Sequence, residues 1–468
     1  FATPDTAIGS IAVLPMANLS DDPGQEYFAD GMTEQLISEV GRVGALRVIS
    51  RASVTRYKNS DLSLPEIARD LDVDALLVAS AIHAGDQVKI SAQLFRARPE
   101  ELLWSASYDR DFRDVLVLMS ELTRAIAEEI NLKLTQREKT FLAQARRVDP
   151  QAYDAYLKGR SYLNQATSDG VLKAIDTFEN AIRTDSTYAP AYAGLSDAYI
   201  MCAWTFASMP IEEALARAET AALKAQALDE TLAEAHSSLA KVRWNRDWDW
   251  QGAEAGFKRA IELNPSCASA YFWYSALLFQ QERIGESIAA IERAHALDPL
   301  SLRVAVSLGY PYYTARLYDE ALTQFRKVRS LDPSFALVRY NLGFTFGAMG
   351  MLDSAIVELE KTVSLEPDDP SYQTMLAFYY AKDEQEAEAE QILETLIERR
   401  DAKQDVPPTL IAIVYLGQGE IDRAFEWMDT AFAERDPFLT NLRVVAEFDS
   451  LHSDPRFTAL LKKVGLEK

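Results

Sequence analysis

The side chains that most often carry catalysis or hold metals are few and scattered along this chain. The two cysteines are 65 residues apart, in no metal or redox spacing. Carboxylates are common, but they recur at the spacing of an exposed helical face. The sequence contains no Walker loop, no dinucleotide-binding glycine motif, no zinc-protease motif and no nucleophile elbow. The four histidines are widely separated and are expected to be ordinary surface or core residues: His83, His236, His295 and His452. The sequence therefore predicts no catalytic site, no metal site and no cofactor.

Composition narrows the class of protein further. The chain has 468 residues, with 71 acidic and 48 basic side chains and a formal net charge of −23. This excess of acid excludes a general nucleic-acid binder, which needs positive charge against phosphates. No stretch approaches 18 consecutive apolar residues, so no membrane span is predicted. Because the chain begins with Phe1 rather than methionine, we expect that it was cut from a longer protein.

A 34-residue period dominates the second half of the chain. Turns of the type Asn-Pro, Asp-Pro or Glu-Pro place prolines at 34-residue intervals: Pro265, Pro299, Pro333 and Pro367. A small residue stands twelve positions before each proline: Ala253, Ser287, Ala321 and Ala355. A bulky residue stands eight positions before: Phe257, Ile291, Phe325 and Leu359. Small residues allow two helices to approach closely, and the bulky ones fill the space that remains.

This pattern resembles the tetratricopeptide repeat, in which each 34-residue unit is a pair of antiparallel helices. About eight units are expected over residues 151–452, followed by a capping helix over residues 453–468, because such arrays need a polar cap. Three irregularities are predicted. Pro311 lies inside a first helix, where it should cause a kink. The segment 243–250 carries one residue more than the period requires, and the second unit has a longer turn before Ala214.

The first part of the chain has a different pattern, which mixes strands and helices. Short apolar or alternating segments predict strands at residues 11–14, 46–49, 74–82, 88–94 and 103–108, with a hairpin turn at Gly85-Asp86. Amphipathic segments predict helices at residues 27–43, 65–71 and 115–134. The expected order is β-α-β-α-β-β-β-α. The fold class is therefore an α/β domain followed by an all-α superhelix, joined by a helical linker over residues 136–150.

Particular sequence segments in this first part suggest a family. The segments Ile11-Ala-Val-Leu-Pro, Gln25-Glu-Tyr-Phe-Ala-Asp-Gly-Met, Leu46-Arg-Val-Ile-Ser-Arg and Leu103-Trp-Ser-Ala-Ser-Tyr-Asp resemble the amino-terminal domain of TolB, in the form found in bacterial signalling proteins. The resemblance covers residues 8–135. It implies an upstream transmembrane helix and an upstream effector, namely an adenylate cyclase, a Ser/Thr kinase or a winged-helix domain. It implies no catalytic residues.

Candidate binding residues follow from the repeat phase. In arrays of this kind the first helices line the concave side, and inner positions should lie 27, 23, 20 and 19 residues before each turn proline. Most of these positions hold aromatic residues here, so an aromatic groove is predicted, made of Lys241, Trp244, Asn245, Phe272, Phe279, Gln280, Tyr310, Tyr313, Tyr340, Phe344 and Phe378. A partner could bind there. Alternatively, these rings pack against one another, or the first domain covers them. Asn341 stands alone, so a clamp for C-terminal carboxylates is not expected.

The function expected from these parts is a non-catalytic sensory or regulatory module of a larger bacterial signalling protein. Its partner would be a protein or peptide in the groove, and a homodimer is possible. The alternative is a free-standing scaffold or envelope assembly factor. The extracytoplasmic side of a membrane-anchored protein is favoured as the location, with the cytoplasm as the alternative. Residues 151–468 carry −17 of the net charge of −23, so a partner on their outer surface should be basic.

Overall fold

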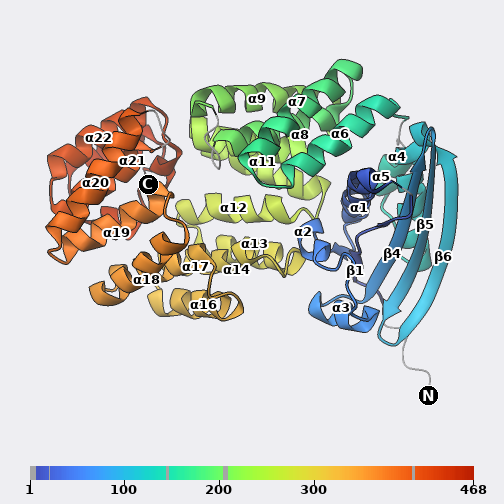
Figure 1. The fold of residues 1–468 in the computed structure, drawn as a ribbon, viewed down its shortest axis with the longest axis horizontal. Helices are drawn as coiled ribbons and strands as arrows, with labels where there is room; N and C mark the ends of the chain where they lie inside the picture. The colour runs from blue at the N-terminus through green and yellow to red at the C-terminus, as the bar shows by residue number, and fades with distance from the viewer. Residues whose placement is uncertain (1–6, 21, 144–146, 204–208, 403–405, 468) are drawn as a thin grey trace. The chain divides into compact units, whose positions relative to one another are not determined.

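The computed structural model describes residues 7–20, 22–143, 147–203, 209–402 and 406–467. The chain forms two compact units (Figure 1). The first unit contains residues 1–240, 255–271 and 293–301, and the second contains residues 241–254, 272–292 and 302–468. Each unit is described separately below. Within the described residues, no helix is both long and apolar enough to cross a membrane.

The first unit contains a mixed β-sheet, built from β1 (Ser10–Val13), β2 (Ala17–Asn18), β3 (Arg47–Val48), β4 (Ala75–Ala84), β5 (Gln87–Ala97) and β6 (Glu100–Asp111). The strand order is β3-β1-β4-β5-β6, and β2 pairs with β4. Strand β1 runs parallel to β3 and β4, whereas β4, β5 and β6 form an antiparallel meander. The predicted hairpin turn is confirmed, with Gly85 at a φ of 58° between β4 and β5. Two short elements were not predicted, namely β2 and α2 (Arg51–Thr55).

Helices cover both faces of this sheet. Helices α1 (Glu26–Gly41) and α4 (Val115–Glu129) pack on one face, where Phe28, Met32 and Leu122 are buried. Helices α2 and α3 (Leu64–Asp70) supply side chains to a second core on the other face. Helix α4 ends at Glu129, five residues before the predicted end, and α5 (Gln136–Ala143) follows. The alternation of buried residues along β4 and β5 explains why two cores form.

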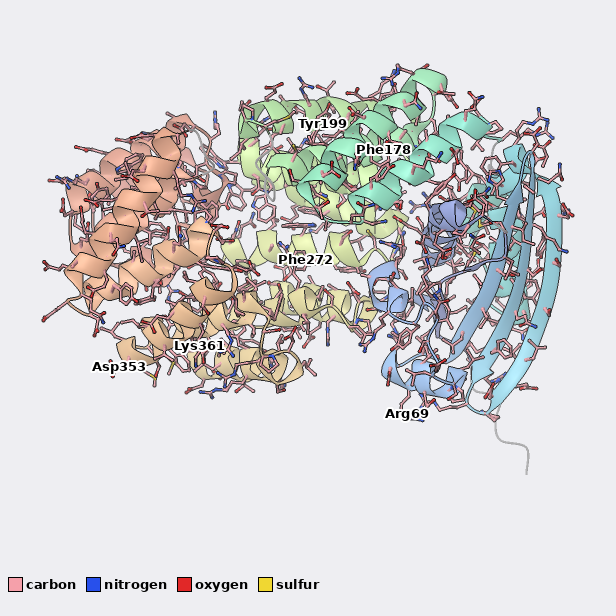
Figure 2. The ribbon with its side chains drawn as sticks, in the orientation of Figure 1. Arg69, Phe178, Tyr199, Phe272, Asp353 and Lys361 are labelled. Carbon is pink, nitrogen blue, oxygen red and sulfur yellow. The ribbon has the colours of Figure 1, made fainter. Side chains whose placement is uncertain are left out.

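Helix pairs make up the remainder of the chain, and neighbouring helices pack against each other. In the first unit these are α6 (Pro150–Leu163), α7 (Ser168–Thr184), α8 (Ala189–Met201) and α9 (Ile211–Leu228). Phe178 of α7 lies between α6 and α8 (Figure 2), and a methyl group at Gly159 or Gly194 would come within 2.7 Å of its ring. The longer turn predicted before Ala214 falls partly outside the described residues.

The helices that follow include four that contribute to both units: α10 (Ala233–Val242), α11 (Trp250–Leu263), α12 (Ala268–Gln280) and α13 (Ile284–Leu297). The second unit continues with α14 (Leu302–Ser307), α15 (Tyr310–Thr314), α16 (Tyr318–Leu331), α17 (Ala336–Ala348), α18 (Leu352–Leu365), α19 (Pro370–Lys382), α20 (Glu386–Asp401), α21 (Pro408–Gln418) and α22 (Ile421–Ala433). It closes with two short 3-10 helices, Pro437–Asn441 and Ala446–Leu451, and with α23 (Pro455–Lys463).

Two of the three predicted irregularities appear in the helices. The kink at Pro311 is confirmed, because the first helix is split into α14, which ends at Ser307, and α15, which begins at Tyr310. The extra residue in segment 243–250 is accommodated by a π-helical turn over Arg243–Asp247, after which Trp248 adopts a left-handed conformation with a φ of 53°. The π-turn takes up the extra residue at the end of the first helix, and the repeat phase resumes in α11.

The α/β domain is attached to two of the proline turns, and all of these contacts lie within the first unit. Ser50 and Ser53 each donate a hydroxyl hydrogen bond of 2.6 Å to Asp298, beside Pro299. The backbone N–H of Val48 donates to the Ser266 hydroxyl, beside Pro265, at 3.2 Å. These turn residues therefore hold the sheet domain as well as ending a helix.

Candidate functional site

The predicted groove residues of the second unit come from successive first helices. Phe272, Phe279 and Gln280 lie on α12, Tyr310 and Tyr313 on α15, Tyr340 and Phe344 on α17, and Phe378 on α19. We call these eight residues the aromatic row. The other three predicted residues precede α11. Lys241 lies in the last turn of α10, and Trp244 and Asn245 lie in the π-turn.

Part of the aromatic row forms one continuous cluster. The ring centroid of Tyr313 lies 4.6 Å from that of Phe344, and Tyr340 lies 5.2 Å from Phe344. Tyr340 also lies 4.9 Å from Tyr372, which was not predicted. Most of these contacts are edge-to-face, which is a favourable geometry for aromatic rings. The structure therefore brings Tyr313, Tyr340 and Phe344 together as predicted neighbours.

The other predicted residues form smaller groups. Phe279 lies 5.8 Å from Tyr310, and Phe378 contacts Tyr379 within its own helix at 5.0 Å. Phe272 packs edge-to-face on Trp273 at 5.0 Å. Near the π-turn, the indole N–H of Trp244 donates to the side-chain oxygen of Gln280 at 3.0 Å, and the Asn245 amide donates to the carbonyl of Lys241 at 3.1 Å. None of the eleven predicted residues is classed as exposed.

A segment near the C-terminus explains much of this burial. We call residues 441–449 the tail segment. Asn441 accepts a hydrogen bond of 2.8 Å from Gln280, and the backbone N–H of Ala446 donates to the Tyr313 hydroxyl at 3.2 Å. Further along, the Tyr379 hydroxyl donates to the Glu447 carboxyl at 2.6 Å. The tail segment therefore contacts α12, α15 and α19 in turn.

Two arginines, one in the repeats and one in the tail segment, hold the tail segment in place. Arg316, in the turn after α15, donates to the carbonyl of Val444 at 2.9 Å and also bonds to the Asp449 carboxylate. From the tail segment itself, Arg443 pairs with Glu282 at 2.7 Å. Such charge-assisted hydrogen bonds are roughly twice as strong as neutral ones. The tail segment is thus recognised through its backbone, its side chains and its charges.

The electrostatic environment at Glu447 is unusual for an acidic side chain. Glu447 is only 5% exposed, and one of its carboxyl oxygens has no hydrogen-bond partner among the described residues. Burial raises the pKa of Glu447, although the hydroxyl of Tyr379 and the charge of Arg316 act in the opposite direction. Burial also raises the pKa of Tyr379 well above its ordinary value. Both groups are therefore biased towards their neutral forms.

Sequence reasoning missed several residues of this site, namely Arg316, Tyr372, Tyr379, Asn441 and Glu447. Tyr379 directly follows the predicted Phe378, and the repeat phase alone does not distinguish the two. The tail segment carries no 34-residue signal, so nothing in the period shows where it packs. One available signal was its set of apolar residues without helical spacing, Leu442, Val444 and Phe448, which must be buried somewhere.

Comparison with known proteins gives a family-model match within the repeat part of the chain, and it also finds similar proteins. Residues 313–377, which include Tyr313, Tyr340 and Phe344, match the tetratricopeptide repeat family model. A protein of Rhizobium meliloti (strain 1021) named "Putative adenylate cyclase 3" is 35% identical over 187 residues. The match covers 40% of this chain and 32% of the relative, so the chain spans about a third of the length of that protein.

Several solved structures are also similar. YrrB, a tetratricopeptide repeat protein with a peptide-binding site, is 24% identical with a TM-score of 0.30, and the match covers 41% of this chain and 93% of YrrB. Yeast Tom70 is 17% identical with a TM-score of 0.44, and the match covers 67% of each chain. The repeat period in the sequence, the helix pairs and the family match agree. Tetratricopeptide repeats are therefore present in this chain, over residues 313–377.

Proposed function

We propose that this chain is the non-catalytic regulatory module of a larger bacterial signalling protein, and that the aromatic row binds a peptide or protein segment. An α/β domain of the TolB amino-terminal type, over residues 8–135, would connect the binding of this segment to an effector elsewhere in the protein. The relative named as an adenylate cyclase supports such a context. Tetratricopeptide repeats are protein-interaction modules, and this supports a protein partner.

The observation that carries the proposal is the tail segment itself. It supplies a backbone N–H to Tyr313, a backbone carbonyl to Arg316 and a carboxyl to Tyr379. These are the groups that any peptide with a suitably placed acidic residue could present. A partner would therefore replace the tail segment on the aromatic row. It would compete with the chain's own segment, whose effective local concentration is on the order of millimolar.

A test uses a fluorescent peptide of residues 436–451 and fluorescence anisotropy. The receptor is the full chain carrying Phe448→Ala, because Phe448 is 1% exposed and its truncation should weaken docking of the chain's own segment. We expect tighter binding of the peptide to this variant than to the unmodified chain. Circular dichroism checks that the variant retains its helices.

Specificity is tested with a pair of adjacent tyrosines in the Phe448→Ala chain. Tyr379→Phe removes the hydroxyl that bonds to Glu447, whereas Tyr380→Phe removes one that bonds to Glu360. Loss of one hydrogen bond is worth about 1 kcal/mol, so Tyr379→Phe should weaken binding about fivefold and Tyr380→Phe should not. Equal affinities for the two variants, or no binding to either chain, would show that the aromatic row is not the binding surface.

A further inference from the structure

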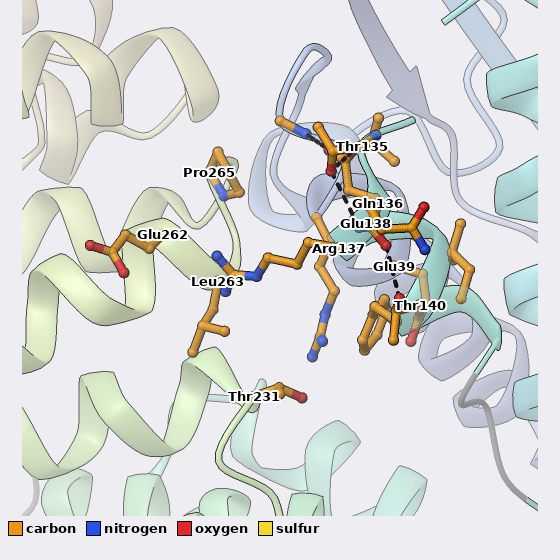
Figure 3. A pocket seen from close by; sticks show the side chains of 15 residues that line it. Glu39, Thr135, Gln136, Arg137, Glu138, Thr140, Thr231, Glu262, Leu263 and Pro265 are labelled. Atoms are coloured by element: carbon orange, nitrogen blue, oxygen red, sulfur yellow. Dashed lines mark hydrogen bonds between the residues drawn. The ribbon is translucent and has the colours of Figure 1, made fainter. Parts of the chain in front are cut away.

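A separate cavity of about 620 Å³ lies in the first unit. It is bordered by the end of α1, by α5, by Thr231 and by the segment 262–265 at the end of α11 (Figure 3). Cavities of this size hold small organic molecules. Its walls come from the α/β domain, from the helix that follows α4, and from two repeat turns. A bound molecule would therefore contact all three parts at once.

Two arginines line this cavity without carboxylate partners. Among the described residues, neither Arg42 nor Arg137 forms an ion pair. The guanidinium of Arg42 lies 3.9 Å above the ring centre of Phe141, and its buried Nε–H has no hydrogen-bond partner in the part of the chain that the structure describes. Arg137 extends from α5 into the same space (Figure 3). A buried N–H without a partner costs free energy unless a ligand or water satisfies it.

The nearby carboxylates are mostly engaged in other bonds. Glu138 accepts hydrogen bonds from the backbone N–H groups of Gly44 and Thr135, at 2.8 and 2.6 Å. Glu262 pairs with Arg259 at 3.1 Å. These carboxylates already have partners, so the two guanidinium groups are left with positive charge directed at the cavity.

The third acidic residue, Glu39, lies one helical turn before Arg42. It is 9% exposed, one carboxyl oxygen accepts from Gln35 at 3.1 Å, and the other has no partner among the described residues. Burial raises the pKa of Glu39 although the charge of Arg42 acts in the opposite direction, and the raised pKa favours the protonated form, which competes less for Arg42. A protonated carboxyl can also donate a hydrogen bond to a ligand oxygen.

The remaining walls are largely apolar. Val43, Phe141, Leu142, Leu263 and Pro265 line the cavity. An apolar body would fit against these side chains while a charged end reached the arginines. From the two unpaired guanidinium groups, the unpaired carboxyl oxygen and the apolar walls, we propose that this cavity binds a small organic carboxylate with an apolar body. This site is distinct from the aromatic row and does not depend on its function.

Isothermal titration calorimetry of the full chain with phenylacetate, 3-phenylpropionate and 4-methylpentanoate tests the proposal. Phenylacetamide, which has the same shape as phenylacetate without its charge, is the matched control ligand. We expect at least one carboxylate to bind with 1:1 stoichiometry and the amide to bind at least tenfold more weakly. Absence of binding by all three carboxylates at millimolar concentration would overturn the proposal.

Variants locate the site. Arg42→Gln and Arg137→Gln should each reduce carboxylate affinity, Arg42→Gln about tenfold or more, because charge-assisted hydrogen bonds are lost. Arg69→Gln is the control, since Arg69 is an exposed arginine of α3 in the same unit (Figure 2). Should Arg42→Gln unfold the chain, Arg137→Gln still gives an answer because Arg137 is exposed. Unchanged affinity in both cavity variants would contradict the assignment of this cavity.

Discussion

Glu447 and Tyr379 form the most specific single contact between the tail segment and the aromatic row. The hydroxyl of Tyr379 donates to a carboxyl that is almost fully buried, and the other carboxyl oxygen has no hydrogen-bond partner among the described residues. A buried carboxylate is costly when ionised, whereas its protonated form is tolerated. This contact should therefore depend on pH in a defined direction.

The native state holds a proton on Glu447 more tightly than the unfolded state does, because burial raises its pKa in the folded chain. Stability from this group is thus fully present below the ordinary glutamate pKa and falls as pH rises through the raised pKa. The charge of Arg316 lowers the pKa of Glu447, whereas the charge of Asp449 raises it. We predict that Glu447→Gln removes this pH dependence while keeping an acceptor for Tyr379. Urea unfolding of the unmodified chain and of the variant between pH 4 and pH 8 measures the free energy of unfolding as a function of pH. If stability falls with rising pH as steeply in the variant as in the unmodified chain, or more steeply, the prediction is wrong.

At the scale of helices, the 34-residue period has a direct structural cause. Gly309 lies in the break between α14 and α15, and Phe325 lies on α16 of the same unit; a methyl group built at Gly309 would come within 2.2 Å of the Phe325 ring. Gly343 and Leu359 repeat this contact in the next unit, at 2.6 Å. In both units the bulky residue eight positions before the turn proline therefore packs against a glycine that precedes it in the same unit.

Two glycines of the second unit give a matched test of this contact. Gly309→Ala should destabilise the chain by about 2 kcal/mol or more, because Phe325 is fully buried and cannot move away freely. Gly285→Ala meets no atom within 4 Å on an exposed turn of α13, and it should stabilise the helix by about 0.5–1 kcal/mol. Urea unfolding of both variants measures the difference. Equal effects would mean that close packing does not select glycine at position 309.

The same elements show what the sequence could predict. The repeat depends on contacts between residues that are close in the sequence, such as those at the turn prolines, at the glycines and at the break at Pro311. The period and the helix pairs could therefore be predicted from the sequence. Strand β2 has two residues and α2 has five, which is too short for a periodic signal. Three of the predicted groove residues, Tyr313, Tyr340 and Phe344, do form one cluster. The packing of the tail segment on them could not be predicted from the sequence. The tail segment meets Tyr313 across 133 residues of chain, and no local pattern encodes such a contact.

At the scale of the whole molecule, the two sites that we propose differ in chemistry, and each lies within one of the two compact units. The cavity of the first unit borders the α/β domain, α5 and two repeat turns, one of which also bonds to Val48 through Ser266. The aromatic row of the second unit holds a peptide segment from the same chain. A regulatory module that senses more than one input would need such separate sites.

Amide hydrogen exchange in the full chain tests the central claim most directly, since a partner can reach the aromatic row only if the tail segment detaches while the repeats stay folded. Amides of residues 442–449 of the tail segment are compared with those of α17, which lies in the same unit. Our account predicts that the tail amides open with a free energy at least about 2 kcal/mol below that of α17, because partial unfolding occurs in cooperative segments. Identical opening free energies and identical denaturant dependence for the two regions would contradict it, since the tail segment would then be a permanent part of the repeat core.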